Sequence, residues 1–181
     1  MTGRVLVAGV GNIFLGDDGF GGAVASRLAG MDLPSWVRVA DYGISGMHLA
    51  YDLAEGYETA VLIDTAQRGE APGTLTVIEA GRPAEPAGAL AQTRMFDAHG
   101  MQPDVVLGVL DMLGDSSARV LVVGCEPASL DYGMELSEPV AKAVDAAVQI
   151  VMDLIAASAD EKAAPADING EGASHVPRHT R

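Results

Sequence analysis

Three continuous apolar runs along the chain predict strands that are buried on both faces. They cover Val5–Val10, Ala60–Asp64 and Arg119–Gly124, and each is bounded by glycine or by charged residues. Such runs are typical of the middle of a parallel sheet. Two further segments, Val37–Ala40 and Thr74–Ile78, mix polar with apolar residues and suit strands nearer the edges. The second of them follows the turn at residues 70–73, so we expect it to return antiparallel to the strand before it.

Helical patterns fill the gaps between these strands. We expect helices at Gly19–Ala29, about Gly46–Ala54, Pro103–Leu113, and Glu138 to about Ala157. The last has valine and isoleucine at helical spacing, and Ser137 can cap its N-terminus. Alternating strands and helices imply right-handed crossovers, with helices on both faces of the sheet. The sequence therefore predicts a three-layer α/β/α fold around a twisted, mostly parallel five-stranded sheet with one antiparallel edge strand.

The length of 181 residues suits one domain, which we place at residues 1–157. Beyond Ala157 the chain is rich in Ala, Asp, Glu, Pro and Gly, which cannot bury enough surface to offset the entropy lost on ordering. We expect residues 158–181 to form a disordered C-terminal tail. The segment Ala80–Ala98 has no convincing periodicity and is expected to be a long loop, and loops of that length are often functional.

Composition narrows the functional classes. The net charge of −14 makes nucleic acid a poor partner. No apolar run reaches the ~20 residues that a membrane span needs, so we expect no membrane insertion. The first strand begins almost at once, without a signal-peptide pattern, and Cys125 is the only cysteine. A cytoplasmic protein without disulfides fits both observations.

Several carboxylates follow the predicted strands at the points where the strands end. Asp18 follows the first strand, Asp41 ends the second, Asp64 ends the third and Glu126 follows the last. In an open parallel sheet, ligands bind beyond the carboxyl ends of the strands, so these four side chains are expected on one edge. His99 can reach the same edge from the long loop. Two carboxylates and an imidazole that converge there are a plausible site for a divalent cation.

Each of these residues also has a simpler interpretation. Asp17 and Asp18 can serve the start of the following helix, where the helix dipole favours acids. Asp64 can form a turn, and His99 can be a solvated surface histidine. Cys125 is better interpreted as a small core hydrophobe than as a nucleophile.

A dinucleotide site is the obvious competitor at the first loop, because Gly9 and Gly11 follow a strand. The third glycine of the fingerprint would fall at Phe14, and the two acids at the helix start would repel a pyrophosphate. No G-x-S-x-G nucleophile motif occurs either. We therefore expect no nucleotide cofactor.

Taken in order, six motifs resemble those of the hydrogenase maturation endopeptidases, which trim the C-terminal extension from the large subunit of nickel-iron hydrogenases. They are G-V-G-N-I-F-L-G-D-D-G-F-G at Gly9–Gly21, D-Y-G-I-S-G-M-H-L at Asp41–Leu49, V-L-I-D-T-A at Val61–Ala66, A-P-G-T at Ala71–Thr74, D-A-H-G-M at Asp97–Met101 and G-C-E-P-x5-G-x2-L-S-x2-V at Gly124–Val140. The match is collinear from about Arg4 to Val151. The first and last motifs are the most specific.

This resemblance implies a function and a set of site residues. The family's two acidic metal ligands fall on Asp18 and Asp64, and its histidine falls on His99, so these three residues are the expected catalytic and metal-binding set. The metal would be nickel, brought by the large-subunit precursor, and cleavage would follow a basic residue of that precursor. Whether metal-bound water attacks the peptide or a carboxylate acts as base stays open.

The glycine-rich segment after the second strand is implied to handle the substrate. Its expected substrate-binding residues are Asp41, Gly43 and Gly46. Asp17 is left with a role at the helix start. The alternative to a protease is a non-catalytic maturation chaperone that binds nickel or the precursor.

Overall fold

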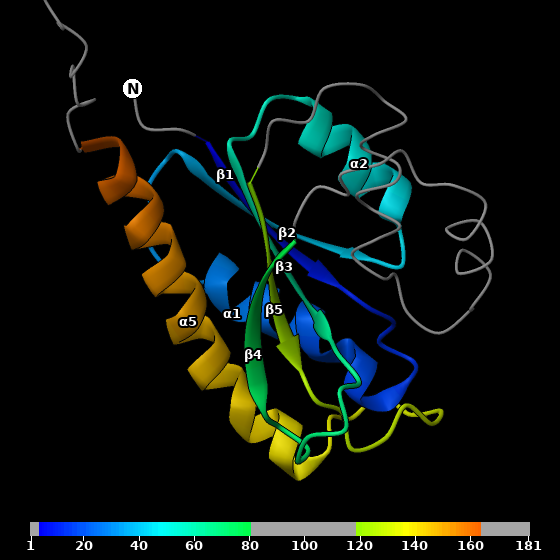
Figure 1. Ribbon diagram of the computed structural model, residues 1–181. Helices are drawn as coiled ribbons and strands as arrows, with labels where there is room; N and C mark the ends of the chain where they lie inside the picture. Colours follow the sequence, from blue (N-terminus) through cyan, green and yellow to red (C-terminus); the bar gives the residue numbers. More distant parts are fainter. Residues whose placement is uncertain (1–3, 81–118, 164–181) are drawn as a thin grey trace, which may run out of the picture.

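The structure is a computed structural model that describes residues 4–80 and 119–163, and it contains a five-stranded mixed sheet (Figure 1). The strands are β1 (Val5–Val10), β2 (Val37–Gly43), β3 (Thr59–Thr65), β4 (Leu75–Ala80) and β5 (Arg119–Cys125). Their order across the sheet is β2-β1-β3-β5-β4. Neighbours from β2 to β5 run parallel, and β4 is antiparallel to β5 at the edge. The predicted fold class is confirmed.

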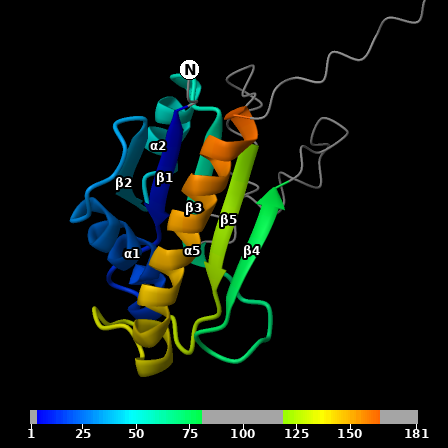
Figure 2. The same ribbon diagram turned by 90° about the vertical axis from the view of Figure 1, so that its left-hand side faces the viewer.

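Helices cover both faces of this sheet. Helices α1 (Phe20–Ala29) and α5 (Glu138–Ala163) pack on one face, and α2 (Gly46–Ala54) packs on the other. Figure 2 shows α5 lying along one side of the sheet, with α2 on the opposite side. None of the helices in the described residues is long and apolar enough to cross a membrane.

The two cores explain why the central strands are apolar at most of their positions. Along β1, Val5 and Val7 face the core beneath α1 and α5, whereas Leu6 and Ala8 face the core beneath α2. Successive strand residues point to opposite faces, so a strand covered on both sides needs apolar residues throughout. The parallel register brings the carboxyl ends of β1, β2, β3 and β5 to one edge of the sheet.

Two details differ from the sequence predictions. Strand β4 has the predicted direction, but its hydrogen-bonded partner is β5, which lies between it and β3. Helix α5 continues to Ala163, so the domain boundary predicted after Ala157 falls within a helix. The Ser158 hydroxyl donates to the Leu154 carbonyl at 2.8 Å, which shows the helical turn continuing past that boundary. Alanine, glutamate and lysine are good helix formers, and here they extend an already packed helix.

Three predictions concern residues outside the described ranges. They are the helix at Pro103–Leu113, the long loop with His99 beyond Ala80, and the tail beyond Ala163.

Candidate functional site

The chain folds back so tightly after β1 that only glycine fits at one position of the loop and at one in the first turn of α1. Gly11 has a φ of 126°, and a Cβ there would lie 1.9 Å from the carbonyl oxygen of Asp18. At Gly21, near the start of α1, a Cβ would lie 2.2 Å from the carbonyl oxygen of Val10. Because the backbone segments come this close to each other, the short 3-10 turn at Gly16–Gly19 lies directly over the end of β1. The glycines therefore serve a close turn, and they hold the acidic pair against the sheet.

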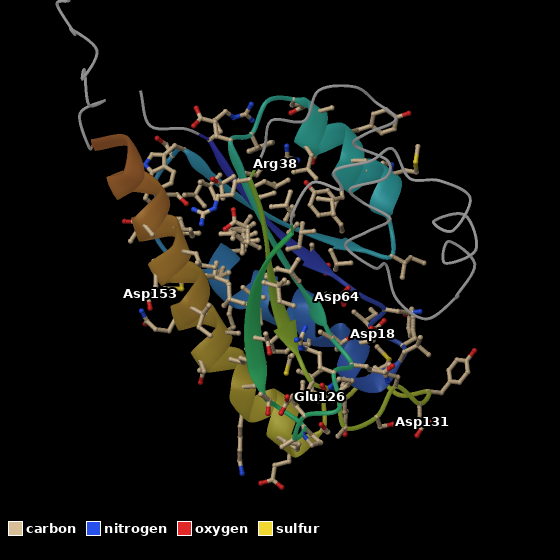
Figure 3. The ribbon with its side chains drawn as sticks, viewed as in Figure 1. Asp18, Arg38, Asp64, Glu126, Asp131 and Asp153 are labelled. Atoms are coloured by element: carbon tan, nitrogen blue, oxygen red, sulfur yellow. The ribbon has the colours of Figure 1, made fainter. Side chains whose placement is uncertain are left out.

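Asp18 and Asp64 come together at this edge, from the 3-10 turn and from β3 (Figure 3). Both are buried, with exposed fractions of 5% and 6%. Thr65 links them: its hydroxyl donates to Asp18 Oδ1 at 2.9 Å, and its backbone N–H donates to Asp64 Oδ1 at 2.7 Å. Asp18 Oδ2 accepts the backbone N–H of Asn12 at 2.8 Å. The structure thus joins two buried carboxylates through one residue, Thr65.

The electrostatics of this pair favour a bound proton or cation. Burial raises the pKa of Asp64, the charge of Asp18 raises it further, and the backbone N–H of Thr65 offsets part of the rise, which leaves the pKa at about 7. Two carboxylates that face each other with little water favour binding of a positive charge between them. Their oxygens are ligands for hard and borderline divalent cations.

Thr65 did not emerge as a site residue from the sequence. The sequence offered one indication of a role for Thr65, which is its position next to Asp64 in V-L-I-D-T-A, at the end of a strand. A hydroxyl at that position can donate to a carboxylate of the turn that follows a neighbouring strand, but that partner becomes visible only once β1 and β3 are paired.

Asp17 has a different role from the one predicted at the helix start. Its carboxylate is 1% exposed and accepts hydrogen bonds from the loop that leads into α5. The donors are the backbone N–H groups of Ala128 (2.8 Å), Ser129 (3.1 Å) and Ser137 (2.6 Å), together with the Ser137 hydroxyl (2.9 Å). Burial raises the pKa of Asp17, but these hydrogen bonds outweigh burial and hold it below its usual value. Asp17 therefore anchors a loop, and the Ser137 hydroxyl is directed to Asp17.

Glu126 also anchors a loop. Its carboxylate accepts the backbone N–H groups of Arg68 at 2.7 Å and Gly69 at 3.2 Å. The bond from Arg68 is the main cause that lowers the pKa of Glu126. The shared-edge argument placed Glu126 correctly at the end of β5, but its side chain holds the loop between β3 and β4.

The segment from Asp41 to Gly46 lies next to the first loop. Asp41 Oδ1 accepts the backbone N–H of Gly43 at 2.9 Å, and the Gly43 carbonyl accepts the N–H of Gly11 at 3.0 Å. Gly43 has a φ of 52°, which this turn requires, and Gly46 begins α2. Asp41 is exposed, so its carboxylate remains available at the edge of the site.

The predicted third ligand, His99, lies outside the described residues. Within residues 4–80 and 119–163, no group of three His, Cys, Asp or Glu residues is placed to hold a metal ion. The structure therefore places two of the three predicted ligands together. Cys125 is buried, and burial raises the pKa of its thiol to about 11, which leaves little thiolate at neutral pH.

Comparison with known proteins places this arrangement in context. A family model described as hydrogenase maturation protease matches residues 23–154. A putative hydrogenase maturation protease of Methanocaldococcus jannaschii is 34% identical over 152 residues, which cover 82% of this chain and 94% of that protein.

Solved structures with the same fold carry related descriptions. The crystal structure of a hydrogenase 2 maturation peptidase from a Thaumarchaeota archaeon is 34% identical with a TM-score of 0.65, over 84% of this chain and 98% of the other. The hydrogenase maturating endopeptidase HybD of Escherichia coli is 26% identical with a TM-score of 0.67, over 86% and 93%. The similarity spans most of each chain.

Proposed function

Because the chain belongs to the hydrogenase maturation protease family, we propose that it removes the C-terminal extension from a nickel-iron hydrogenase large-subunit precursor after nickel insertion. The observation that carries this proposal is the buried pair of Asp18 and Asp64, joined by Thr65 at the carboxyl edge of the sheet. Open parallel sheets bind ligands at this edge.

In this proposal the nickel belongs to the substrate, and Asp18, Asp64 and His99 contact it. Within residues 4–80 and 119–163, neither Asp18 nor Asp64 forms an ion pair with a cationic side chain. Two such buried carboxylates gain from a divalent cation, which offsets both their desolvation and their mutual repulsion. A precursor that lacks nickel offers no such gain. The site therefore distinguishes a nickel-loaded precursor from an empty one through charge.

The cleavage step draws on the same groups. Nickel can polarise the peptide carbonyl or lower the pKa of a water molecule beside it. A carboxylate of the pair can take the proton from that water. Hydrolysis then adds one water across the peptide bond, and the leaving amine takes up the proton.

The turn from Asp41 to Gly46 contacts the precursor in this proposal, with Asp41, Gly43 and Gly46 as the substrate-binding residues. The support is their position: the turn is hydrogen-bonded to Gly11, beside Asp18, and it presents an exposed carboxylate. We place the reaction in the cytoplasm, because a chain whose only cysteine is buried and free suits a reducing compartment.

A processing assay tests the function and the site together. Purified protein is incubated with nickel-loaded precursor, and cleavage is followed by the gel shift of the large subunit. We expect Asp18→Asn, Asp64→Asn and His99→Ala to abolish cleavage. Asp153→Asn, which alters an exposed carboxylate on α5, should leave the rate unchanged (Figure 3).

Two outcomes would contradict the proposal. Cleavage at the normal rate by all three variants would show that Asp18, Asp64 and His99 are not the active site. Binding of the nickel-loaded precursor by the unaltered protein without any cleavage would favour the non-catalytic chaperone.

A further inference from the structure

Two loops beside the carboxylate pair expose large apolar side chains to solvent. In the loop after β1, Ile13 is 46% and Phe14 is 55% exposed. In the loop after β5, Tyr132 is 93% and Met134 is 70% exposed. We call residues 13–16 and 129–135 together the apolar double loop. Apolar residues gathered on a surface in this way are typical of interaction sites.

These loops are held together rather than left loose. The backbone N–H of Gly16 donates to the Gly133 carbonyl at 2.8 Å, and the N–H of Gly133 donates to the Phe14 carbonyl at 3.0 Å. A parallel bridge pairs Leu15 with Gly133. Phe14 and Tyr132 precede these bridged residues in their two loops, so the pairing brings their backbones side by side.

The buried carboxylate of Asp17 fixes the base of the second loop. It accepts hydrogen bonds from residues 128, 129 and 137, which lie on both sides of the exposed Tyr132 and Met134. A buried charge with four donors is a strong anchor. A loop fixed in this way loses less conformational entropy when a partner binds to its exposed side chains.

The double loop is continuous with the proposed active site. Asn12, directly before Ile13, donates its backbone N–H to Asp18. A protein segment whose backbone reaches Asp18 and Asp64 therefore passes next to Ile13 and Phe14. The substrate is itself a protein, so it has residues on either side of the bond that is cut.

The charge around the double loop indicates the chemistry of its partner. Asp131 and Glu135 are exposed there, and no lysine or arginine occurs at residues 5–26 or 120–141. An acidic and apolar surface is complementary to an apolar segment that carries lysine or arginine.

We propose that the apolar double loop is the docking surface for the precursor segment next to the cleaved bond, an apolar stretch with at least one basic residue. This inference rests on the proposed function. Tyr132 and Met134 would be buried against that segment, while Asp131 and Glu135 would lie at the rim near its basic side chain.

The test is to measure steady-state processing and direct binding with the full-length protein and nickel-loaded precursor. The double variant Tyr132→Ser/Met134→Ser should raise KM and Kd by about tenfold or more, with kcat within about twofold, because exposed aromatic and methionine anchors carry much of the affinity of an interface. Thermal unfolding should be unchanged, since both side chains are exposed. Higher salt should weaken binding of the unaltered protein.

A matched control separates the position from the substitution. Met31 is 44% exposed and lies between α1 and β2, at the opposite end of the sheet. Met31→Ser should leave KM unchanged, whereas Met134→Ser alone should raise it. A rise in KM for Met134→Ser without a rise for Met31→Ser would support the docking surface.

Other outcomes would overturn it. If the unaltered protein cleaves the precursor and the double variant has the same KM, the docking surface is wrong and the proposed function stands. If the double variant loses kcat at unchanged KM, the loops act in the chemical step instead. If sedimentation shows a dimer that the double variant abolishes while KM is unchanged, the partner is a second copy of this chain. If the unaltered protein neither binds nor cleaves the precursor, the proposed function fails as well.

Discussion

Replacing Asp64 with asparagine should stabilise the metal-free protein at neutral pH. The pKa of Asp64 rises from 3.8 to about 7 in the folded protein, chiefly because the carboxyl is buried. Each pKa unit corresponds to about 1.4 kcal/mol of difference between the two protonation states. The shift therefore costs the folded state about 4 kcal/mol when the carboxyl is fully ionised. Asparagine has nearly the same shape and carries no charge.

The pH dependence follows from which state holds the proton. Below about pH 4 both the folded and the unfolded protein hold it, so ionisation costs nothing there. Between about pH 4 and 7 the unfolded chain releases the proton while the folded protein keeps it, and the free energy of unfolding falls by about 1.4 kcal/mol per pH unit. Above about pH 7 both states have released the proton, and the free energy of unfolding falls no further from this group. Asp64→Asn lacks this contribution, so its advantage should appear only as the pH rises.

Urea denaturation of both proteins from pH 4.5 to 8.5, without metal, measures this difference. Other titrating groups are common to both proteins and largely cancel. Asp18→Asn serves as the control, because it removes the neighbouring charge but keeps Asp64 buried. In this variant the free energy of unfolding should still fall as the pH rises, but by less than in the unaltered protein. A difference between Asp64→Asn and the unaltered protein that stays constant within about 0.5 kcal/mol across this range would refute the reasoning.

Three further substitutions test the surrounding structure. Asp17→Asn should lower the free energy of unfolding by roughly 2–4 kcal/mol in urea denaturation, because an amide keeps fewer of the four hydrogen bonds; an unchanged midpoint would contradict its role as an anchor. Thr65→Val should slow precursor processing by roughly 10- to 100-fold while Thr65→Ser restores it, since valine lacks the hydroxyl that donates to Asp18; equal rates for both variants would exclude that role. Gly21→Ala should lower the unfolding temperature, because its methyl group would lie 2.2 Å from the Val10 carbonyl oxygen; an unchanged temperature would contradict this close packing.

Most of the fold was predictable because its signals are local. A strand buried on both faces needs a continuous apolar run, and β1, β3 and β5 each contain one. The long stripe of α5 is also visible in the sequence. The pairing of β4 with β5 was not, because a strand after a short turn pairs with its neighbour in sequence unless a later strand inserts between them. That choice depends on tertiary packing and leaves no local pattern.

The candidate site was predictable only in part. The rule that ligands bind at the carboxyl edge selected Asp18 and Asp64, but it selected Asp41 and Glu126 equally. The resemblance to the family narrowed the choice to the pair that the structure brings together. The anchoring role of Asp17 could not be predicted, because its hydrogen-bond donors lie more than a hundred residues away in the sequence.

What separates the site carboxylates from the anchors is how their oxygens are used. An ionised carboxylate has about four lone-pair positions. Asp17 fills its positions with four donors, and Glu126 accepts two backbone N–H groups from a loop far away in the sequence. Within the described residues, Asp64 accepts hydrogen bonds only from the adjacent Thr65. Asp18 accepts two hydrogen bonds, from the Asn12 N–H and the Thr65 hydroxyl, so Asp64 is the buried acid of this edge with the most acceptor capacity left. This capacity supports the proposal that Asp64, together with the neighbouring Asp18, binds the metal of the precursor.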